Sequence, residues 1–157
     1  MCYNIKQEVA IPPGLSGEIK GGADMIAGIG LDLCDIERMK RAIERPRFIQ
    51  RIYTAAEAER IVAASEIRRA EIAAGLFSAK EAVSKALGTG LAGIGTDEIE
   101  ITPDEAGCPR CALHGKAQAR ARALCGEHFT VWVSITHESG MAAATAVIES
   151  QTMNQNE

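Results

Sequence analysis

Residues 76–91, LFSAKEAVSKALGTGL, are the stretch that most limits what this chain can fold into. Apolar side chains recur at helical spacing here and just upstream, which predicts one helix with a buried face. The members of that face are Ile72, Leu76, Val83 and Leu87. Glu81 and Lys85 lie four positions apart on roughly the opposite side. The helix runs into Gly88-Thr89-Gly90, where glycine permits a positive φ and a close backbone approach to a ligand.

This arrangement has two interpretations. A carboxylate, an ammonium group and a glycine-lined loop within about ten residues can hold a metal ion and an anion together. A glutamate followed by a lysine four positions later is also a common surface ion pair, which stabilises a helix by only about 0.2–0.5 kcal/mol. Spacing alone favours the surface pair, so the functional interpretation needs support from elsewhere in the chain.

Length and composition exclude several classes of protein. The chain has 157 residues, which is enough for one compact domain with a hydrophobic core. A net charge of −4 argues against non-specific nucleic-acid binding by the whole surface. No apolar run is long enough to span a membrane, and the first residues lack the basic start and apolar core of a secretory signal. We therefore expect a cytoplasmic protein that binds neither nucleic acid nor membrane.

Changes in composition and periodicity along the sequence predict three regions. Residues 1–24 are rich in proline and glycine without a sustained period, which predicts a flexible N-terminal extension. Residues 25–150 carry the periodic patterns of a folded domain, and residues 151–157 read as a polar tail.

Local patterns predict the elements of the domain. Apolar runs and alternation predict strands over 26–33, 97–102, 111–113, 129–136 and 141–149. Helical spacing and capping residues predict helices over 36–45, from Thr54 to about Arg69, from Glu71 onward after a short break, and over 115–124. The strand over 26–33 is expected to be buried, because its run is apolar. His137 to Gly140 is expected to be a turn, and the glycine-rich segment 88–96 a mobile loop.

Alanines 142–144 and 146 are poor strand formers, so a helix or another subunit is expected to pack closely against them.

Charge is unevenly distributed along the chain. Six of the fourteen residues from 38 to 51 are basic, and Glu44 is the single acidic residue among them. Arg38, Arg41 and Arg45 lie on the side of the predicted helix opposite its apolar residues. This pattern is equally typical of a solvated face that keeps the protein soluble and of a surface that docks an acidic partner.

The five cysteines, an odd number without a secretory signal, are expected to be reduced thiols. Cys108, Cys111, His114, Cys125 and His128 superficially resemble a zinc site. Only one CxxC pair is present, however, and an alanine-rich helical segment separates the other two residues from it. A small zinc-binding domain is therefore a minor alternative.

Three blocks of the sequence, taken together, resemble the holo-[acyl-carrier-protein] synthases, the short-chain 4′-phosphopantetheinyl transferases. They are GIGLDLCDIERMK from Gly28, FSAKEAVSKALGTGL from Phe77 and SITHESGMAAATAVIE from Ser134, and they occur in the family's order. RIYTAAE from Arg51 also looks like that family. The resemblance covers about residues 25–149, and three ordered blocks are far more specific than any one of them.

The resemblance implies a fold and a reaction. The fold would be a compact α+β domain, with a small antiparallel sheet and a long packed helix, which assembles as a homotrimer with active sites between subunits. The reaction would transfer the phosphopantetheine arm of coenzyme A, the co-substrate, to a serine of apo acyl carrier protein and release adenosine 3′,5′-bisphosphate. Longer, two-copy transferases perform related chemistry, but this chain is too short for two copies.

The resemblance also implies roles for particular residues. The family's Mg²⁺ ligands correspond to Asp32 and Glu81, its motif lysine to Lys85, and the histidine of its SITH block to His137. Lys85 would stabilise the leaving group, and Glu81 or a magnesium-bound water would take the serine proton. Gly88, Thr89 and Gly90 are expected to line the coenzyme A site together with Lys85 and His137.

Acyl carrier proteins are acidic, so Arg38, Arg41 and Arg45, which follow Asp32, would dock the carrier. The alternative outside the enzyme class is a non-catalytic module that binds an acidic protein through a basic helix over 38–51. A binder of that kind would not need Asp32, Glu81 and Lys85 together.

The chain departs from the family's pattern at three places. Leu76 precedes Phe77 where many relatives carry arginine, so one basic contact is either missing or supplied elsewhere. Cys108, in Gly107-Cys108-Pro109, stands where Gly-Lys-Pro is common. The 24-residue extension has no counterpart.

Overall fold

The structure, a computed structural model, describes residues 25–151. The expected extension over 1–24, and all of the expected polar tail except Gln151, lie outside the described residues. In chain order the elements are β1 (Met25–Asp35), α1 (Ile36–Ile43), α2 (Pro46–Ile52), α3 (Ala55–Ala63), α4 (Glu66–Ala86), the 3₁₀ turn η1 (Thr96–Glu98), β2 (Ile99–Pro103), β3 (Pro109–Leu113), α5 (Gly115–Cys125), β4 (Phe129–Glu138) and β5 (Met141–Ser150).

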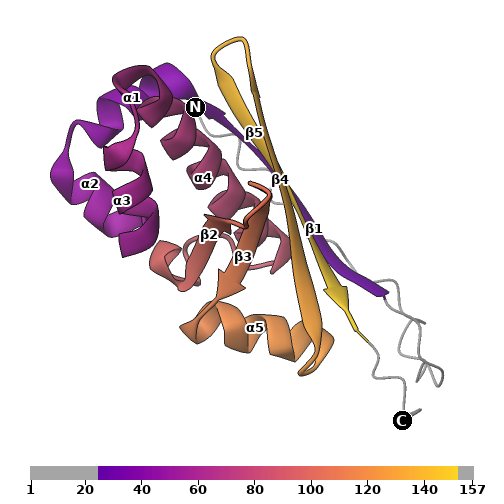
Figure 1. Ribbon diagram of the computed structural model, residues 1–157. Helices are drawn as coiled ribbons and strands as arrows, with labels where there is room; N and C mark the ends of the chain where they lie inside the picture. The colour runs from indigo at the N-terminus through magenta and orange to yellow at the C-terminus, as the bar shows by residue number, and fades with distance from the viewer. Residues whose placement is uncertain (1–24, 152–157) are drawn as a thin grey trace.

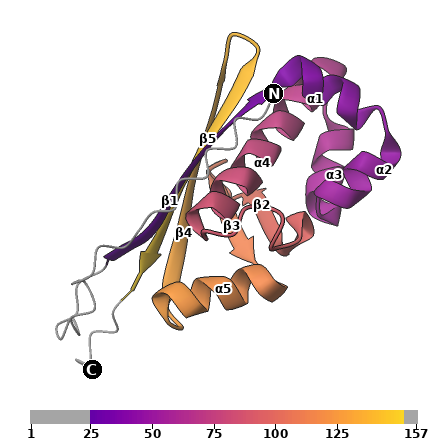
Figure 2. The same ribbon diagram turned by 180° about the vertical axis from the view of Figure 1, so that it is seen from behind.

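The five strands form one antiparallel sheet in the order β1-β5-β4-β3-β2. Helices α1 to α4 all lie on one face of this sheet, and in both views no helix of residues 25–151 lies on the other side of β1, β5 and β4 (Figures 1 and 2). The predicted α+β class, with a small antiparallel sheet and a long helix packed on it, is therefore confirmed. No helix in the described part of the chain is long and apolar enough to cross a membrane.

Helix α4 is the centre of the core. It packs on β1, β5 and β4 and is flanked by α1 and α3, as Figure 1 shows. Because it has neighbours on several sides, twelve of its 21 residues are buried, rather than a single stripe. Most of the residues that face the sheet are small, so the helix axis can approach the strands closely. The alanines of β5 meet this helix: Ala142, Ala144 and Ala146 are each at most 2% exposed. The close partner expected for them is therefore α4.

Two glycines of β1 also permit this close approach. A Cβ on Gly28 would overlap the carbonyl oxygen of Ala86, and a Cβ on Gly30 would overlap that of Ala82. Both carbonyls belong to the last turns of α4. The GxG spacing in this strand therefore serves helix–strand packing, because only glycine leaves room for the helix backbone there.

The prediction that residues 26–33 form a strand is confirmed, but the expected burial is wrong. β1 lies at the edge of the sheet, and only one of its faces meets α4. On the other face Ile29, Leu31 and Leu33 are 68%, 58% and 62% exposed. An apolar run predicts burial only if both faces of the strand are covered.

Two predicted helix boundaries are also wrong. The break between α3 and α4 falls at Ala64–Ser65 and not near residue 70. There the side chain of Arg69 donates to the carbonyl oxygens of Val62 and Ala64 and so satisfies the end of α3. The basic segment 38–51 is not one helix, because Pro46 begins a second helix after Arg45. Proline lacks an N–H and is well suited to the first helical position.

The predicted terminal hairpin is confirmed with a shorter turn. His137 does not lie in the turn, because it pairs with Ala142 inside the β4–β5 ladder. The two turn residues are Ser139 and Gly140, with φ of 50° and 78°. Positive φ at both central positions matches the twist of the flanking strands, which favours a two-residue loop.

Candidate active site

β1 and α4 bring together three of the residues that the sequence singled out, Asp32, Glu81 and Lys85. Lys85 Nζ lies 2.8 Å from Asp32 Oδ1 and donates to the carbonyl oxygen of Leu31 at 3.0 Å. The Glu81 carboxyl, one helical turn before Lys85, is close enough to feel the charge of Asp32. Gly28 and Gly30 let β1 lie directly against the last turns of α4. This close contact therefore determines the distances between the side chains of the cluster.

The electrostatics of the cluster are those of two carboxylates that share one cation. Burial, and next the charge of Asp32, hold the pKa of Glu81 above its usual range, and Lys85 opposes this shift. The Asp32 side chain is 16% exposed and that of Lys85 is 47% exposed. Solvent therefore reaches the cluster from the Lys85 side, where a ligand can also enter.

The donor set of this cluster fits a magnesium ion. Mg²⁺ prefers oxygen ligands and is commonly held by one or two carboxylates together with a substrate phosphate. Asp32 and Glu81 supply two such carboxylates from different elements, and Asp32 already binds a cation, the Lys85 ammonium.

The loop after α4 is held at its start. Gly88 and Gly90 have φ of 73° and 58°, as expected for glycines at the end of a helix. The backbone N–H groups of Thr89 and Gly90 both donate to the carbonyl oxygen of Ser84, at 3.2 Å. Arg120 on α5 donates to the carbonyl oxygen of Leu87 at 2.9 Å. The predicted glycine segment is thus a loop with an anchored start, beside the end of the helix that carries Lys85.

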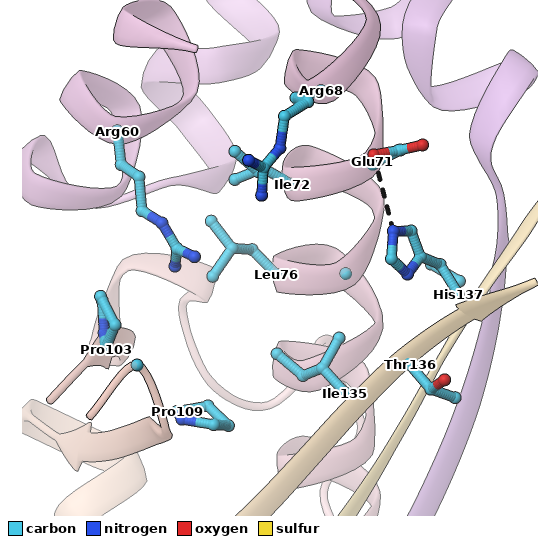
Figure 3. A pocket seen from close by; sticks show the side chains of 13 residues that line it. Arg60, Arg68, Glu71, Ile72, Leu76, Pro103, Pro109, Ile135, Thr136 and His137 are labelled. Atoms are coloured by element: carbon cyan, nitrogen blue, oxygen red, sulfur yellow. Dashed lines mark ion pairs between the residues drawn. The ribbon is translucent and has the colours of Figure 1, made fainter.

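His137 lies in a different place, in a cavity of about 230 Å³ shown in Figure 3. Arg60 on α3 and Arg68 on α4 reach into this cavity towards Leu76 and Ile72 (Figure 3). The remaining lining includes Thr136, Pro103, Gly107 and Pro109. His137 Nε2 lies 3.5 Å from Glu71 Oε2. The cavity therefore combines apolar walls with two arginines, His137 and the carboxylate of Glu71 beside it, and the two arginines suit a ligand with an anionic group.

Within one subunit this cavity and the Asp32–Glu81–Lys85 cluster are separate. His137 meets α4 at Glu71, whereas Lys85 lies fourteen positions further along the same helix, a rise of about 21 Å. The predicted coenzyme A residues thus fall into two groups, one at each end of α4.

The remaining predicted site residues are on the surface. Arg38 and Arg41 on α1 and Arg45 at the start of α2 are all exposed. The side chain of Asp35 caps α1 by accepting from the Arg38 backbone N–H at 2.7 Å, as predicted. Because β1 runs directly into α1, these arginines follow Asp32 closely along the chain.

The cysteines do not form a metal centre in residues 25–151, where no three His, Cys, Asp or Glu side chains come together to hold an ion. Burial raises the pKa of Cys111 to about 12, which disfavours the thiolate that a metal would need. Cys108 lies in the exposed turn between β2 and β3.

Sequence reasoning missed Arg60, Arg68 and Arg120. Arg60 and Arg68 belong to different helices and converge only after α3 folds back on α4, so no spacing rule could have paired them. Leu76 was a partial signal. The family resemblance leads us to expect arginine there, and in the structure Leu76 is 2% exposed and lines the cavity that Arg60 and Arg68 enter.

Comparison with known proteins gives one consistent result. Residues 28–145 match the family model of the 4′-phosphopantetheinyl transferase superfamily. The holo-[acyl-carrier-protein] synthase of Solidesulfovibrio magneticus is 45% identical over 129 residues, which cover 80% of this chain and 99% of the relative. The synthase of Clostridium perfringens is 39% identical over 130 residues, which cover 81% of this chain and 96% of the relative.

Solved structures are similar as well. The Bacillus anthracis holo-(acyl-carrier-protein) synthase in complex with CoA (3′,5′-ADP) has a TM-score of 0.68 and 32% identity, and the match covers 81% of this chain and 99% of that one. The Plasmodium yoelii holo-ACP-synthase has a TM-score of 0.71 and 26% identity, with coverage of 83% and 99%.

Proposed function

This chain belongs to the 4′-phosphopantetheinyl transferase superfamily, and we propose that it is a holo-[acyl-carrier-protein] synthase. It transfers the 4′-phosphopantetheine arm of coenzyme A to a serine of apo acyl carrier protein and releases adenosine 3′,5′-bisphosphate. The observation that carries the proposal is the convergence of Asp32, Glu81 and Lys85 beside the Gly88–Gly90 loop. A module that only bound an acidic protein would have no use for this cluster.

Asp32 and Glu81 would hold Mg²⁺. When bound, the ion supplies Lewis-acid stabilisation of the charge that develops on the pyrophosphate oxygens. Lys85 gives up its contact with Asp32 and moves its ammonium to the phosphate that becomes the leaving group. Its exposed side chain is free to make this change.

The serine oxygen attacks the phosphorus next to the pantetheine arm, and the bond from this phosphorus to the bridging oxygen breaks. The leaving adenosine 3′,5′-bisphosphate keeps the electron pair of that bond. Glu81, which lies beside Asp32 on the face of α4 towards β1, is the side chain of this chain placed to accept the serine proton. Since the nucleophile belongs to the carrier, this chain needs no serine or cysteine nucleophile of its own.

The anionic nucleotide end of coenzyme A binds in the cavity with Arg60, Arg68 and His137. That cavity and the Asp32 cluster are far apart in one subunit, so the complete site forms between two subunits of a homotrimer. The bare face of the sheet supports this assembly. Ile29, Leu31 and Leu33 on β1 and Trp132 on β4, which is 49% exposed, share that face, and an apolar surface of this kind is typical of a subunit interface.

The acidic carrier docks on Arg38, Arg41 and Arg45. This position follows from the chain path, since these side chains are exposed immediately after the strand that carries Asp32. Electrostatic attraction would raise the rate of encounter and orient the carrier serine towards Asp32 and Glu81.

One experiment tests the reaction. The protein is incubated with coenzyme A, Mg²⁺ and an apo acyl carrier protein, and the carrier is weighed by intact mass spectrometry. We expect the carrier to gain one phosphopantetheine arm, and we expect a chelator and the Glu81→Gln substitution each to abolish the gain. No gain with several carriers, from a folded oligomeric protein that still binds those carriers through α1, would support the binding module.

A further inference from the structure

A buried ion pair lies outside the residues that the proposed reaction uses. Lys80 Nζ is 2.7 Å from Glu57 Oε2, and both side chains are completely buried. Burial lowers the pKa of Lys80, and Glu57 opposes this shift. Burying two charges is costly, and replacing such a pair with apolar side chains is often neutral or stabilising. Stability therefore does not by itself explain this pair.

The hydrogen bonds of the pair are complete. An ammonium has three N–H donors, and besides Glu57 the Lys80 ammonium donates to the carbonyl oxygens of Thr96, at 2.7 Å, and Ile99. Glu57 in turn accepts from the backbone N–H groups of Thr54 at 2.8 Å and Ile101 at 2.7 Å. The pair is thus the centre of a network that joins the start of α3, the middle of α4, η1 and β2.

The network lies where the loop after α4 returns to the domain. This loop leaves the helix at Leu87 and ends at η1 and β2, whose carbonyl oxygens Lys80 binds. Its start is held separately, by the bonds of Thr89 and Gly90 to Ser84. Without the ammonium of Lys80, the returning end would keep its strand pairing and its apolar packing but would lose the hydrogen bonds that Lys80 makes to it.

Lys80 directly precedes Glu81. Successive helical residues point about 100° apart, so Lys80 faces β2 while Glu81 faces β1 and Asp32. On the β1 side the same helical turns are held by the close contacts at Gly28 and Gly30. This part of α4 is therefore held on two sides, by backbone packing against β1 and by the hydrogen bonds of Lys80 to η1 and β2.

We propose that Lys80 and Glu57 are positioning residues, which fix the returning end of the 87–95 loop against the helical turn that carries Glu81. They thereby hold the second half of this loop, whose first half carries the glycines expected to line the coenzyme A site, close to Glu81. This inference rests on the proposed function, because it concerns the geometry of that same site. Neither side chain touches the substrate.

The test uses a paired substitution, because Lys80→Met alone would leave a buried carboxylate without a partner and could fail to fold. In Glu57→Gln/Lys80→Met both charges are removed, and glutamine can still serve in the capping box with Thr54. We expect amide hydrogen exchange in residues 88–96 to accelerate about tenfold, ahead of the rest of the domain. The KM for coenzyme A should rise about tenfold with a smaller change in kcat, because binding must now order the loop.

Tyr53→Phe is the matched control. It removes another buried hydrogen bond to α4, from the Tyr53 hydroxyl to the Ala73 carbonyl at 2.9 Å, in the half of the helix remote from the loop. We expect it to lower the melting temperature but to leave both the exchange of residues 88–96 and the KM for coenzyme A unchanged. If Tyr53→Phe raised KM as much as the double substitution, the effect would be general loss of stability, and the inference would be overturned.

Two further results would overturn the inference. One is a double variant with wild-type exchange in residues 88–96 and a wild-type KM. The other is exchange that accelerates uniformly over α3, α4 and β2 with KM unchanged, which would mean that the pair serves stability alone. If the wild-type protein showed no transfer, the proposed function would be wrong. Hydrogen exchange needs no substrate, so the exchange comparison would still decide the role of the Lys80–Glu57 pair.

Discussion

At the scale of single residues, the position of Glu81 in the Asp32–Glu81–Lys85 cluster lowers stability but serves the proposed function. Glu81 is held near Asp32 and partly shielded from water, which disfavours its ionised form. The proposed reaction needs that ionised form, to hold the metal ion and to accept a proton. Unfavourable placement of a carboxylate is common at catalytic sites, because the same environment that costs stability produces reactivity.

Glu81→Gln is therefore expected to abolish transfer and to raise the melting temperature at neutral pH. A carboxyl whose folded pKa lies above its unfolded value costs stability as pH rises from the unfolded pKa through the folded one. The difference in melting temperature between variant and wild type should thus be close to zero at acidic pH, below the ordinary glutamate pKa, and positive near neutrality. Calorimetry from pH 4 to pH 8 checks this. Glu59→Gln, at an exposed position on α3, controls for loss of one carboxylate, and a difference independent of pH would contradict the prediction.

Lys85→Met tests the contact between Lys85 and Asp32. Removing the ammonium frees Asp32 and removes a positive charge, so the coenzyme-free protein should bind Mn²⁺, a probe for Mg²⁺, several-fold more tightly. Transfer should nevertheless fall roughly a hundredfold, because the leaving group loses its cation. Electron paramagnetic resonance titration at pH 8 measures the metal affinity. Unchanged or weaker Mn²⁺ binding would show that Lys85 does not compete for the metal position.

At the scale of elements, the contact between β1 and α4 determines the geometry of the site. The strand carries Asp32 and the helix carries Glu81 and Lys85, so the spacing of these side chains depends on the glycines between the two backbones. The strand in this contact, β1, continues directly into α1, which carries Arg38 and Arg41. A change at this contact should affect stability and catalysis together.

Gly30→Ala is expected to cost about 1–3 kcal/mol of unfolding free energy, because its Cβ would overlap the Ala82 carbonyl and force the strand away from the helix. Transfer should fall with it, since Asp32 moves with the strand. Urea unfolding gives the free energy. Gly126→Ala is the control: a Cβ there meets no atom within 4 Å, but φ of 80° and ψ of −165° nearly require glycine, so it should cost about 1–3 kcal/mol of backbone strain and leave transfer unchanged. Equal effects of both substitutions on transfer would contradict this account.

Arg38→Glu/Arg45→Glu tests the role of α1 and the start of α2. Reversal of these charges should mainly raise the KM for the acyl carrier protein and reduce its dependence on salt, with little effect on kcat. Steady-state kinetics over a series of salt concentrations check this. Arg122→Glu on α5, also exposed, is the control for a change in net charge and should leave KM near the wild-type value. A normal KM in the double variant would exclude carrier docking on this surface.

At the scale of the whole molecule, the two places that hold the predicted site residues do not meet within one chain. The carboxylate cluster lies at one end of α4 and the basic cavity at the other, and the uncovered face of the sheet is apolar. A closed trimer would account for both observations. It would cover the apolar face, and it could bring the cavity of one subunit next to the carboxylates of its neighbour.

Mixing two inactive variants tests this arrangement. Glu81→Gln and His137→Ala should each lose most activity alone, but trimers reassembled from an equal mixture should regain about a quarter of it, because one site in four then combines both intact residues. Leu31→Asp/Leu33→Asp should yield monomers by light scattering and prevent this recovery. No recovery from mixed trimers would show that Glu81 and His137 do not act across an interface.

Features that depend on neighbours along the chain could be predicted from the amino-acid sequence. Helical spacing predicted most of α4, alternation predicted the β4–β5 hairpin, and capping residues predicted the starts of α1 and α3. Three ordered blocks predicted the family, and with it Asp32, Glu81 and Lys85. These three came together in the structure, because Asp32 and the Lys85–Glu81 turn lie on elements in direct contact.

The tertiary structure alone decided which surfaces are covered and which distant side chains meet. The apolar run of β1 is exposed because the strand lies at an edge, a position that the pattern of the strand itself does not encode. Arg60 and Arg68 share a cavity, and Lys80 meets Glu57, because α3 folds back on α4. Periodicity reports the conformation of a segment, whereas burial and long-range pairing depend on the packing of all the segments together. That is why Asp32, Glu81 and Lys85 were predictable from sequence as a cluster, whereas the meeting of Arg60 with Arg68 and of Lys80 with Glu57 was not.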